Sequence, residues 1–291
     1  MTHIAVAVSP DQAPGIETTL AEALDRAELP LKGKVRSLSD SAAEADIVLD
    51  NPVQEAAFES RLASVGADGA ILPAANRKKR LLICDMDSTI IQQECLDELA
   101  DFAGLKEEIS AITERAMRGE LNFEEALTHR VSMLAGLSVY AIEDCYRDRI
   151  QLSAGAQTLV RTMAADGARC LLVSGGFTAF TSRVAEAAGF HAHHANTLLD
   201  DGAELTGKVG LPILGREAKQ TTLLETAKEL GLAAEDALAM GDGANDLAMI
   251  QTAGLGIAYR AKPVVAEASD AAINRTDLTT VISSVYRINE L

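Results

Sequence analysis

The fold of this chain is decided by the stretch Leu81-Leu82-Ile83-Cys84-Asp85-Met86-Asp87-Ser88-Thr89. Four apolar residues run without a break into two acids and a Ser-Thr pair. A short continuous apolar run that ends in polar residues is typical of a strand buried in a parallel sheet. Two later runs have the same form: residues 170–173 lead into Ser174-Gly175-Gly176-Phe177, and residues 237–240 lead into Gly241-Asp242-Gly243-Ala244-Asn245-Asp246.

Stretches of helical spacing separate these runs, and residues 255–258 and 271–273 look like further strands. Strands that alternate with helices predict an α/β fold with a doubly wound parallel sheet. Ligands of such sheets bind at the carboxyl ends of the strands. All three polar clusters fall at such ends, so we expect them to share one site.

Residues 93–149 interrupt this alternation with four helical patterns, at 95–102, 105–118, 122–134 and 139–149. A helical insert directly after the first strand of the sheet is expected to lie above the strand ends as a cap. Residues 196–208 predict a hairpin around Asp201-Gly202.

The first 76 residues predict a small unit of their own. Strands at 4–9, 33–38, 45–49 and 69–72 and helices at 15–27 and 54–65 give the order β-α-β-β-α-β of a ferredoxin-like α+β domain. Pro14-Gly15-Ile16 resembles the turn of small-molecule-binding ACT domains, which leaves two interpretations open: a regulatory or dimerising module, or a purely structural one. The predicted division is therefore 1–76, a catalytic core of 77–92 and 150–291, and a helical cap of 93–149.

Composition excludes several classes of protein. The 291 residues carry 26 basic and 43 acidic side chains, a net charge of −17, and aromatics make up 3% without any Trp. Such a chain repels phosphate backbones and lacks a stacking platform, so nucleic-acid binding is not expected. The one basic run, residues 77–80, is interpreted as a solvated linker or the start of a strand.

The sequence also predicts a cytoplasmic protein without a membrane segment. No apolar stretch approaches the roughly 18 residues of a membrane helix, and the first residues lack the basic start of a signal peptide. Reduced thiols are expected, because none of the four cysteines forms a Cys-x-x-Cys pair: Cys84, Cys95, Cys145 and Cys170. The cluster His191, His193 and His194 lacks a Cys or Asp partner at useful spacing and is interpreted as a surface segment.

Four aspartates at the predicted strand ends indicate the chemistry of the site. Two carboxylates about 4 Å apart repel by about 1–4 kcal/mol at effective dielectric constants between 80 and 20, and a cation between them removes that cost. Asp85 with Asp87 and Asp242 with Asp246 therefore indicate a site for Mg²⁺, which prefers oxygen ligands. An Asp is also a nucleophile in some phosphoryl-transfer enzymes.

Together, these motifs resemble the four motifs of haloacid dehalogenase superfamily phosphatases: Asp85 to Thr89, Ser174-Gly175-Gly176, Lys219, and Gly241 to Asp246. From Leu81 to about Ile288 the chain resembles the phosphoserine phosphatase family of that superfamily. The resemblance implies Asp85 as nucleophile, Asp87 as general acid and base, Ser174 and Gly175 as phosphate donors and Lys219 as charge neutraliser. It further implies Mg²⁺ bound by Asp85, Asp87 and Asp242, with Asp246 in support.

The substrate implied is L-phosphoserine, hydrolysed to L-serine and phosphate through an aspartyl phosphate in the last step of L-serine biosynthesis. Glu94 matches the residue for the substrate ammonium and Arg130 the one for the carboxylate. Other substrate neighbours implied by the resemblance are Met117, Phe123 and Asn245. A homodimer is one oligomeric state that remains open.

Two alternatives remain open. The first is a phosphatase or phosphotransferase for another small ester, such as phosphothreonine or phosphohomoserine. The second is a serine-sensing binding module with a silent catalytic core, which the intact acids, Ser174 and Lys219 disfavour.

Overall fold

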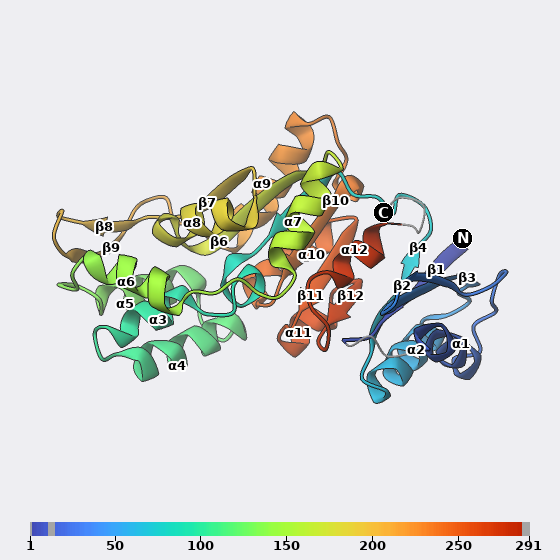
Figure 1. Ribbon diagram of the computed structural model, residues 1–291. Helices are drawn as coiled ribbons and strands as arrows, with labels where there is room; N and C mark the ends of the chain where they lie inside the picture. Colours follow the sequence, from blue (N-terminus) through green and yellow to red (C-terminus); the bar gives the residue numbers. More distant parts are fainter. Residues whose placement is uncertain (1, 11–14, 287–291) are drawn as a thin grey trace.

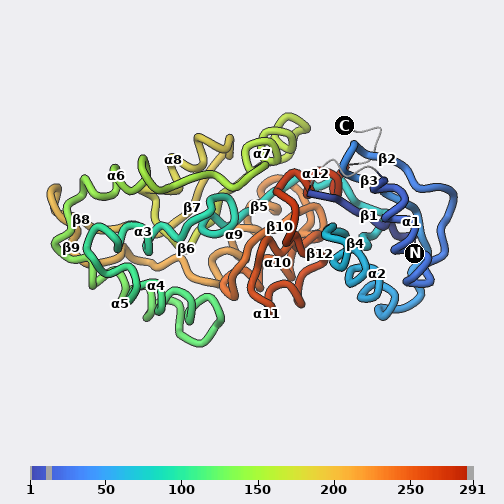
Figure 2. The backbone as a smooth tube through the Cα atoms, turned by 60° about the horizontal axis from the view of Figure 1, so that its bottom comes forward, coloured from blue at the N-terminus to red at the C-terminus, as the bar shows by residue number. Residues whose placement is uncertain are grey.

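A computed structural model of the chain describes residues 2–10 and 15–286. The molecule is elongated, with a small unit at one end, a parallel sheet in the middle and a helical insert at the other end (Figures 1 and 2). None of the described helices is long and apolar enough to cross a bilayer.

The central sheet has six parallel strands in the order β12-β11-β10-β5-β6-β7. This confirms the predicted doubly wound α/β fold. Its strands are β5 (Leu81–Cys84), β6 (Arg169–Phe177), β7 (Ala192–Asn196), β10 (Ala237–Gly241), β11 (Leu255–Tyr259) and β12 (Ala271–Ile273).

Helices cover both faces of this sheet because successive strand residues point to opposite sides. In β5, Leu82 and Cys84 pack in the cluster that contains α7 (Ala156–Ala165), α8 (Thr178–Ala188) and α12 (Thr280–Val285). The alternate residues Leu81 and Ile83 pack with α9 (Arg216–Glu229), α10 (Leu247–Thr252) and α11 (Pro263–Ala266).

The edge strand β7 was not predicted, although the three histidines His191, His193 and His194 do lie in a surface segment, as expected. Residues 192–196 pair in parallel with β6, and the His193 ring lies 2.9 Å from Thr181 Oγ1. The histidines are nevertheless exposed or half-buried. An edge strand of this kind needs no apolar run, which is why the pattern conceals it.

The insert consists of α3 (Cys95–Asp101), α4 (Lys106–Met117), α5 (Phe123–Ser132) and α6 (Tyr140–Arg149). The chain enters and leaves it through two adjacent segments, joined by a bridge between Ile91 and Leu152 and by the bond from Gln92 N to Gln151 O, 3.0 Å. The predicted hairpin forms as β8 (Leu198–Asp200) and β9 (Leu205–Val209), and β9 packs against α5. The hairpin thus lies beside the insert, next to α5 and α6 (Figure 1).

The N-terminal unit has a four-stranded antiparallel sheet in the order β2-β3-β1-β4, as in a ferredoxin-like fold. Its elements are β1 (Thr2–Val8), α1 (Ile16–Arg26), β2 (Arg36–Ser39), β3 (Ala42–Val48), α2 (Pro52–Ser64) and β4 (Asp68–Pro73). In the triplet resembling an ACT turn, Pro14 lies outside the described residues, while Gly15 has φ 103° and caps α1. A positive φ of this size favours glycine.

The contact between this unit and the rest of the chain is buried and partly polar, since Ala70 and Leu72 of β4 also join the apolar cluster of the core. Arg77 forms an ion pair of 2.5 Å with Glu44 of β3 and donates hydrogen bonds to the carbonyls of Ser283 and Ser284. Both side chains of the ion pair are less than 5% exposed. Asp68 of β4 accepts hydrogen bonds from three successive backbone N–H groups at residues 274–276.

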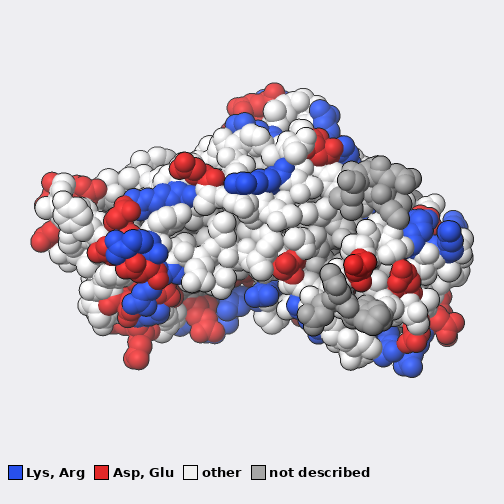
Figure 3. Space-filling model, viewed as in Figure 1, with Lys and Arg blue, Asp and Glu red and all other residues white. Residues whose placement is uncertain are grey.

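The basic run at 77–80 is therefore only partly solvated, and its interpretation as a solvated linker is wrong for Arg77 and Lys79, which are buried. The start of β5 does follow it, as expected. Elsewhere on the face drawn in Figure 3, acidic and basic side chains are interspersed among the described residues.

Candidate active site

The site begins where β5 ends. Asp85 follows the strand directly, is 2% exposed, and its backbone N–H extends the pairing with β10 by donating to Met240 O at 2.9 Å. Lys219 reaches it from α9, with Nζ 2.7 Å from Asp85 Oδ1 and 2.6 Å from Asp246 Oδ1. A lysine of one helix thus becomes a buried cation between two carboxylates.

Burial is the largest single influence on the pKa values of Asp85 and Lys219. Burial and repulsion by Asp246 raise the pKa of Asp85 to about 7, against the attraction of Lys219. Burial by itself would lower the pKa of Lys219, but the two carboxylates more than offset that effect and raise it. Lys219 therefore stays charged in this pocket.

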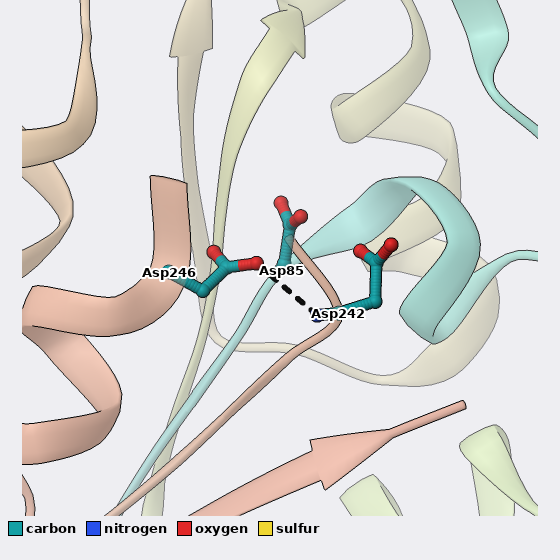
Figure 4. A group of neighbouring side chains, drawn as sticks. All are labelled: Asp85, Asp242 and Asp246. Carbon is teal, nitrogen blue, oxygen red and sulfur yellow. Dashed lines mark hydrogen bonds between the residues drawn. The ribbon is translucent and has the colours of Figure 1, made fainter. Parts of the chain in front are cut away.

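Two further acids, Asp242 and Asp246, lie beside Asp85, as Figure 4 shows. Oxygens of Asp85, Asp242 and Asp246 lie within 4.8 Å of one another. Both oxygens of Asp246 are engaged, one by Lys219 and the other by the backbone N–H groups of Asp242 and Gly243 at 3.2 and 3.1 Å. Asp242 Oδ1, in contrast, is buried without a hydrogen-bond partner among the described residues.

This arrangement fits a divalent cation. An unpartnered buried carboxylate oxygen is costly unless a cation or a donor satisfies it. Burial and the acids around it raise the pKa of Asp242 well above its ordinary value, which a bound cation would reverse. The donors are all oxygens, as magnesium prefers.

Asp87 lies two residues beyond Asp85 and faces the same cavity. Its carboxylate accepts hydrogen bonds from Cys95 N at 2.7 Å and from Ser174 Oγ at 3.2 Å. Burial raises its pKa in spite of these two bonds, which favour the ionised form. Ser174 Oγ in turn accepts a hydrogen bond from Gly176 N at 2.8 Å, so the loop after β6 orients the serine.

The insert closes over these groups. A Cβ atom on Gly175 would lie 2.5 Å from Phe123 Cζ, and one on Gly243 would lie 2.7 Å from Met117 Sδ. At both positions the atom in the way is the tip of a side chain of α4 or α5, so these helices lie in direct contact with the loops at the strand ends. The insert, called the cap below, therefore lies against the loops at the strand ends.

A small cavity of about 30 Å³ lies between cap and strand ends, beside a second one of about 230 Å³ that shares Glu94 and Met117 with it. The lining of the smaller cavity brings together nine of the residues singled out in the sequence: Asp85, Asp87, Glu94, Met117, Phe123, Arg130, Ser174, Gly175 and Asn245. The other three, Lys219, Asp242 and Asp246, lie in the acidic cluster that includes Asp85. Asn245 Oδ1 is buried without a partner among the described residues.

Glu94 and Arg130 line the cap side of this cavity. Glu94 accepts a hydrogen bond from Ser88 Oγ at 2.7 Å, and burial and the charge of Asp87 raise its pKa to about 8. Arg130 is 4% exposed, and burial lowers its pKa. The carboxyl group of Glu94 and the guanidinium of Arg130 thus share one cavity with Asp85 and Asp87.

Two polar residues near Arg130 were not singled out in the sequence. Asp97 is 8% and Thr113 3% exposed, and Thr113 Oγ1 lies 2.6 Å from Asp97 Oδ1. A signal was present: Thr113 follows the buried Ile109 by four residues, so a hydroxyl occupies the apolar stripe of α4.

Comparison with known proteins identifies the class. The family model described as haloacid dehalogenase-like hydrolase matches residues 82–251. A solved hydrolase of that family from Salmonella enterica superposes over 98% of both chains with a TM-score of 0.86 and 30% identity. The chain is therefore a member of the haloacid dehalogenase-like hydrolases.

Curated relatives place the chain in a narrower family of these hydrolases. A protein of a Polaromonas species named phosphoserine phosphatase is 46% identical over 211 residues, 71% of this chain and 89% of the relative. One of the same name from Archaeoglobus fulgidus is 44% identical over 72% of this chain, which spans only 60% of that relative's length. A structure titled as the phospho-aspartyl intermediate analogue of phosphoserine phosphatase is 38% identical with a TM-score of 0.69, and the match covers 72% of this chain and all of the other. The chain belongs to the phosphoserine phosphatase family.

Proposed function

We propose that this protein is a magnesium-dependent phosphatase that hydrolyses L-phosphoserine to L-serine and phosphate. The observation that carries the proposal is the two-sided cavity. Asp85, Asp87 and Ser174 line its core side, and Glu94 and Arg130 line its cap side. A phosphate ester with an amino and a carboxylate group matches both sides, and the relatives named above carry the same activity in their names.

Asp85 is the proposed nucleophile. One of its oxygens is held by Lys219, while the other accepts no hydrogen bond from the described residues. In the proposed reaction that oxygen attacks phosphorus, the bond from phosphorus to the serine oxygen breaks, and Asp87 donates its proton to the leaving oxygen. Asp87 then takes a proton from the water that hydrolyses the aspartyl phosphate.

The raised pKa of Asp87 supports its part as the acid, because burial favours the protonated carboxyl. Ser174 and the backbone N–H of Gly175 are proposed to donate to the phosphoryl oxygens, with Asn245 close by. Lys219 neutralises the charge beside the nucleophile.

Magnesium is proposed to bind the carboxylates of Asp85 and Asp242 and the backbone carbonyl of Asp87. Asp246 is proposed to support the magnesium site without binding the ion directly, because Lys219 and two backbone N–H groups already engage its oxygens. When bound, the ion supplies positive charge for the transferring phosphoryl group.

The cap selects the substrate in this proposal. Arg130 binds the carboxylate, Glu94 binds the ammonium, and Met117 and Phe123 provide the apolar walls. A cavity of about 30 Å³ holds about two waters at about 10–15 Å³ each, too little for a phosphate ester. Substrate therefore enters by movement of the cap.

We also propose the division into 1–76, 77–92 with 150–291, and 93–149, supported by the separate sheets and by an apolar cluster that the first unit forms within itself. The proposed place of the enzyme is the last step of L-serine biosynthesis in the cytoplasm, where its four buried free thiols would stay reduced.

The test is phosphate release from L-phosphoserine in the presence of Mg²⁺ and of EDTA. We expect release with the ion and none with the chelator. Phosphothreonine, phosphohomoserine and p-nitrophenyl phosphate serve as competing substrates, and added alcohols as phosphoryl acceptors. A preference for one of those esters, or transfer to the alcohol in place of hydrolysis, would contradict the proposal.

Arg130→Ala sharpens the test. Leaving one partner of a buried charged contact unpaired costs about 2–5 kcal/mol, so kcat/KM for L-phosphoserine should fall by at least about 30-fold, with a much smaller fall for p-nitrophenyl phosphate. The exposed Arg147 of α6 gives the control variant Arg147→Ala. Equal losses on both substrates would assign Arg130 to the fold and not to recognition.

A further inference from the structure

The guanidinium of Arg130 is held by a buried chain of polar groups that spans three cap helices. Nε donates to the carbonyl of Ala126 at 3.2 Å, and Nη1 donates to Thr113 Oγ1 at 2.8 Å. Thr113 Oγ1 lies 2.6 Å from Asp97 Oδ1. The chain therefore runs from α5 through α4 to α3.

Counting protons fixes the direction of these bonds. A threonine hydroxyl has one proton to donate, and here its oxygen already accepts from Arg130. The proton can go to Asp97 Oδ1 at 2.6 Å or to Ile109 O at 3.1 Å. The shorter, charge-assisted bond to the carboxylate is the stronger one. Asp97 thus fixes the orientation of the Thr113 hydroxyl, and this hydroxyl in turn holds the Arg130 guanidinium.

The same chain leaves Nη2 of Arg130 available. Among the described residues Nη2 donates no hydrogen bond, and Arg130 lines the cavity that it shares with Glu94 and Ser174. Asp97 compensates the buried positive charge through the Thr113 hydroxyl and makes no ion pair with the guanidinium itself, so Nη2 remains free to donate to a substrate carboxylate.

We propose that Asp97 and Thr113 are positioning residues that hold the Arg130 guanidinium ready for the substrate carboxylate and thereby set the preference for esters that carry one. This inference rests on the proposed function, because it presupposes that Arg130 receives a carboxylate.

The test compares Thr113→Val, which removes the hydroxyl at nearly constant volume, with Thr113→Ser, which keeps it. For L-phosphoserine we expect Thr113→Val to raise KM about tenfold, the lower end for a hydrogen bond to a charged group, with kcat changed less than about twofold. Thr113→Ser should restore KM, and p-nitrophenyl phosphate should be hydrolysed at similar rates by all three proteins. The exposed Thr128 of α5 gives the control Thr128→Val.

Asp97→Asn separates charge from hydrogen bonding. The amide oxygen still accepts from Thr113, but the negative charge is lost, so KM for L-phosphoserine should rise by an intermediate factor of about three. Thermal unfolding of each variant checks that the cap remains folded.

The outcomes separate the two proposals. A wild-type protein that does not hydrolyse L-phosphoserine refutes the proposed function. If it does, and Thr113→Val either has the wild-type KM or loses both substrates equally, the positioning inference is wrong while the proposed function stands.

Discussion

Replacing Lys219 by methionine removes the cation that is buried between Asp85 and Asp246. The lysine is 1% exposed, and its nitrogen lies 2.7 and 2.6 Å from the two carboxylates. Methionine keeps much of the volume, so the change acts on charge more than on packing. Three carboxylates within 4.8 Å of one another then remain without a counter-charge.

Removing one partner of a buried ion pair costs about 3–5 kcal/mol. Protonation limits that loss here, because the pKa of Asp85 is already raised to about 7 and rises further without the lysine. We therefore expect a fall of about 3 kcal/mol in the free energy of unfolding at pH 7.5, and a smaller fall at pH 5.5. With an m-value of about 3 kcal/mol/M, the urea midpoint moves by about 1 M.

Urea unfolding followed by circular dichroism measures both values, in EDTA and again with Mg²⁺. The ion should restore part of the stability, because it returns positive charge to the cluster. Lys228→Met, an exposed lysine of the same helix, is the matched control. A Lys219→Met protein as stable as the wild type at pH 7.5 in EDTA would refute this account of the cluster.

Three further predictions follow from described contacts. Asp85→Asn should fold like the wild type by circular dichroism but release no phosphate from L-phosphoserine, because an amide is no nucleophile; turnover by a variant shown free of deamidation would contradict this. Burial raises the pKa of Glu94 to about 8 from an ordinary 4.5, so the folded protein keeps a proton that the unfolded chain has lost. Its stability therefore falls as the pH rises from 5 to 8, by at most about 1.4 kcal/mol per pH unit, and urea titrations should show a flatter fall for Glu94→Gln. Glu44→Gln leaves the buried Arg77 without its charge partner and should cost about 3–5 kcal/mol in thermal unfolding without changing kcat, whereas Glu22→Gln at an exposed pair should cost less than about 1 kcal/mol.

The sequence predicts those parts of the fold well whose burial requires a recognisable pattern of apolar residues. Leu81–Cys84 and Ala271–Ile273 are strands at the expected bounds, because a strand covered on both faces must be apolar throughout. Ala192–Asn196 escapes notice because a half-exposed edge strand tolerates histidine and asparagine. The burial of Arg77 and Lys79 was not predicted, because their partners Glu44 and Glu235 O are far away in the sequence.

The candidate site divides in the same way. The acids at the strand ends signal their chemistry by position alone. Lys219 does not, since a lysine in a helix is usually solvated, and only its order among the other motifs suggested a role. Thr113 and Asp97 act through hydrogen bonds to Arg130 and to each other. Their spacing in the sequence alone does not tell that Arg130 is the side chain they hold.

The bridge between Ile91 and Leu152 has a consequence for how such an enzyme diversifies. The two ends of the helical insert leave the sheet side by side, so a loop of almost any length can span them at a small cost in closure entropy. The core strands need not shift when the insert is lengthened, shortened or exchanged. Substrate choice can then evolve in one segment while the nucleophile and its lysine stay in place in another. Grafting a foreign insert between residues 92 and 151 is the corresponding engineering route.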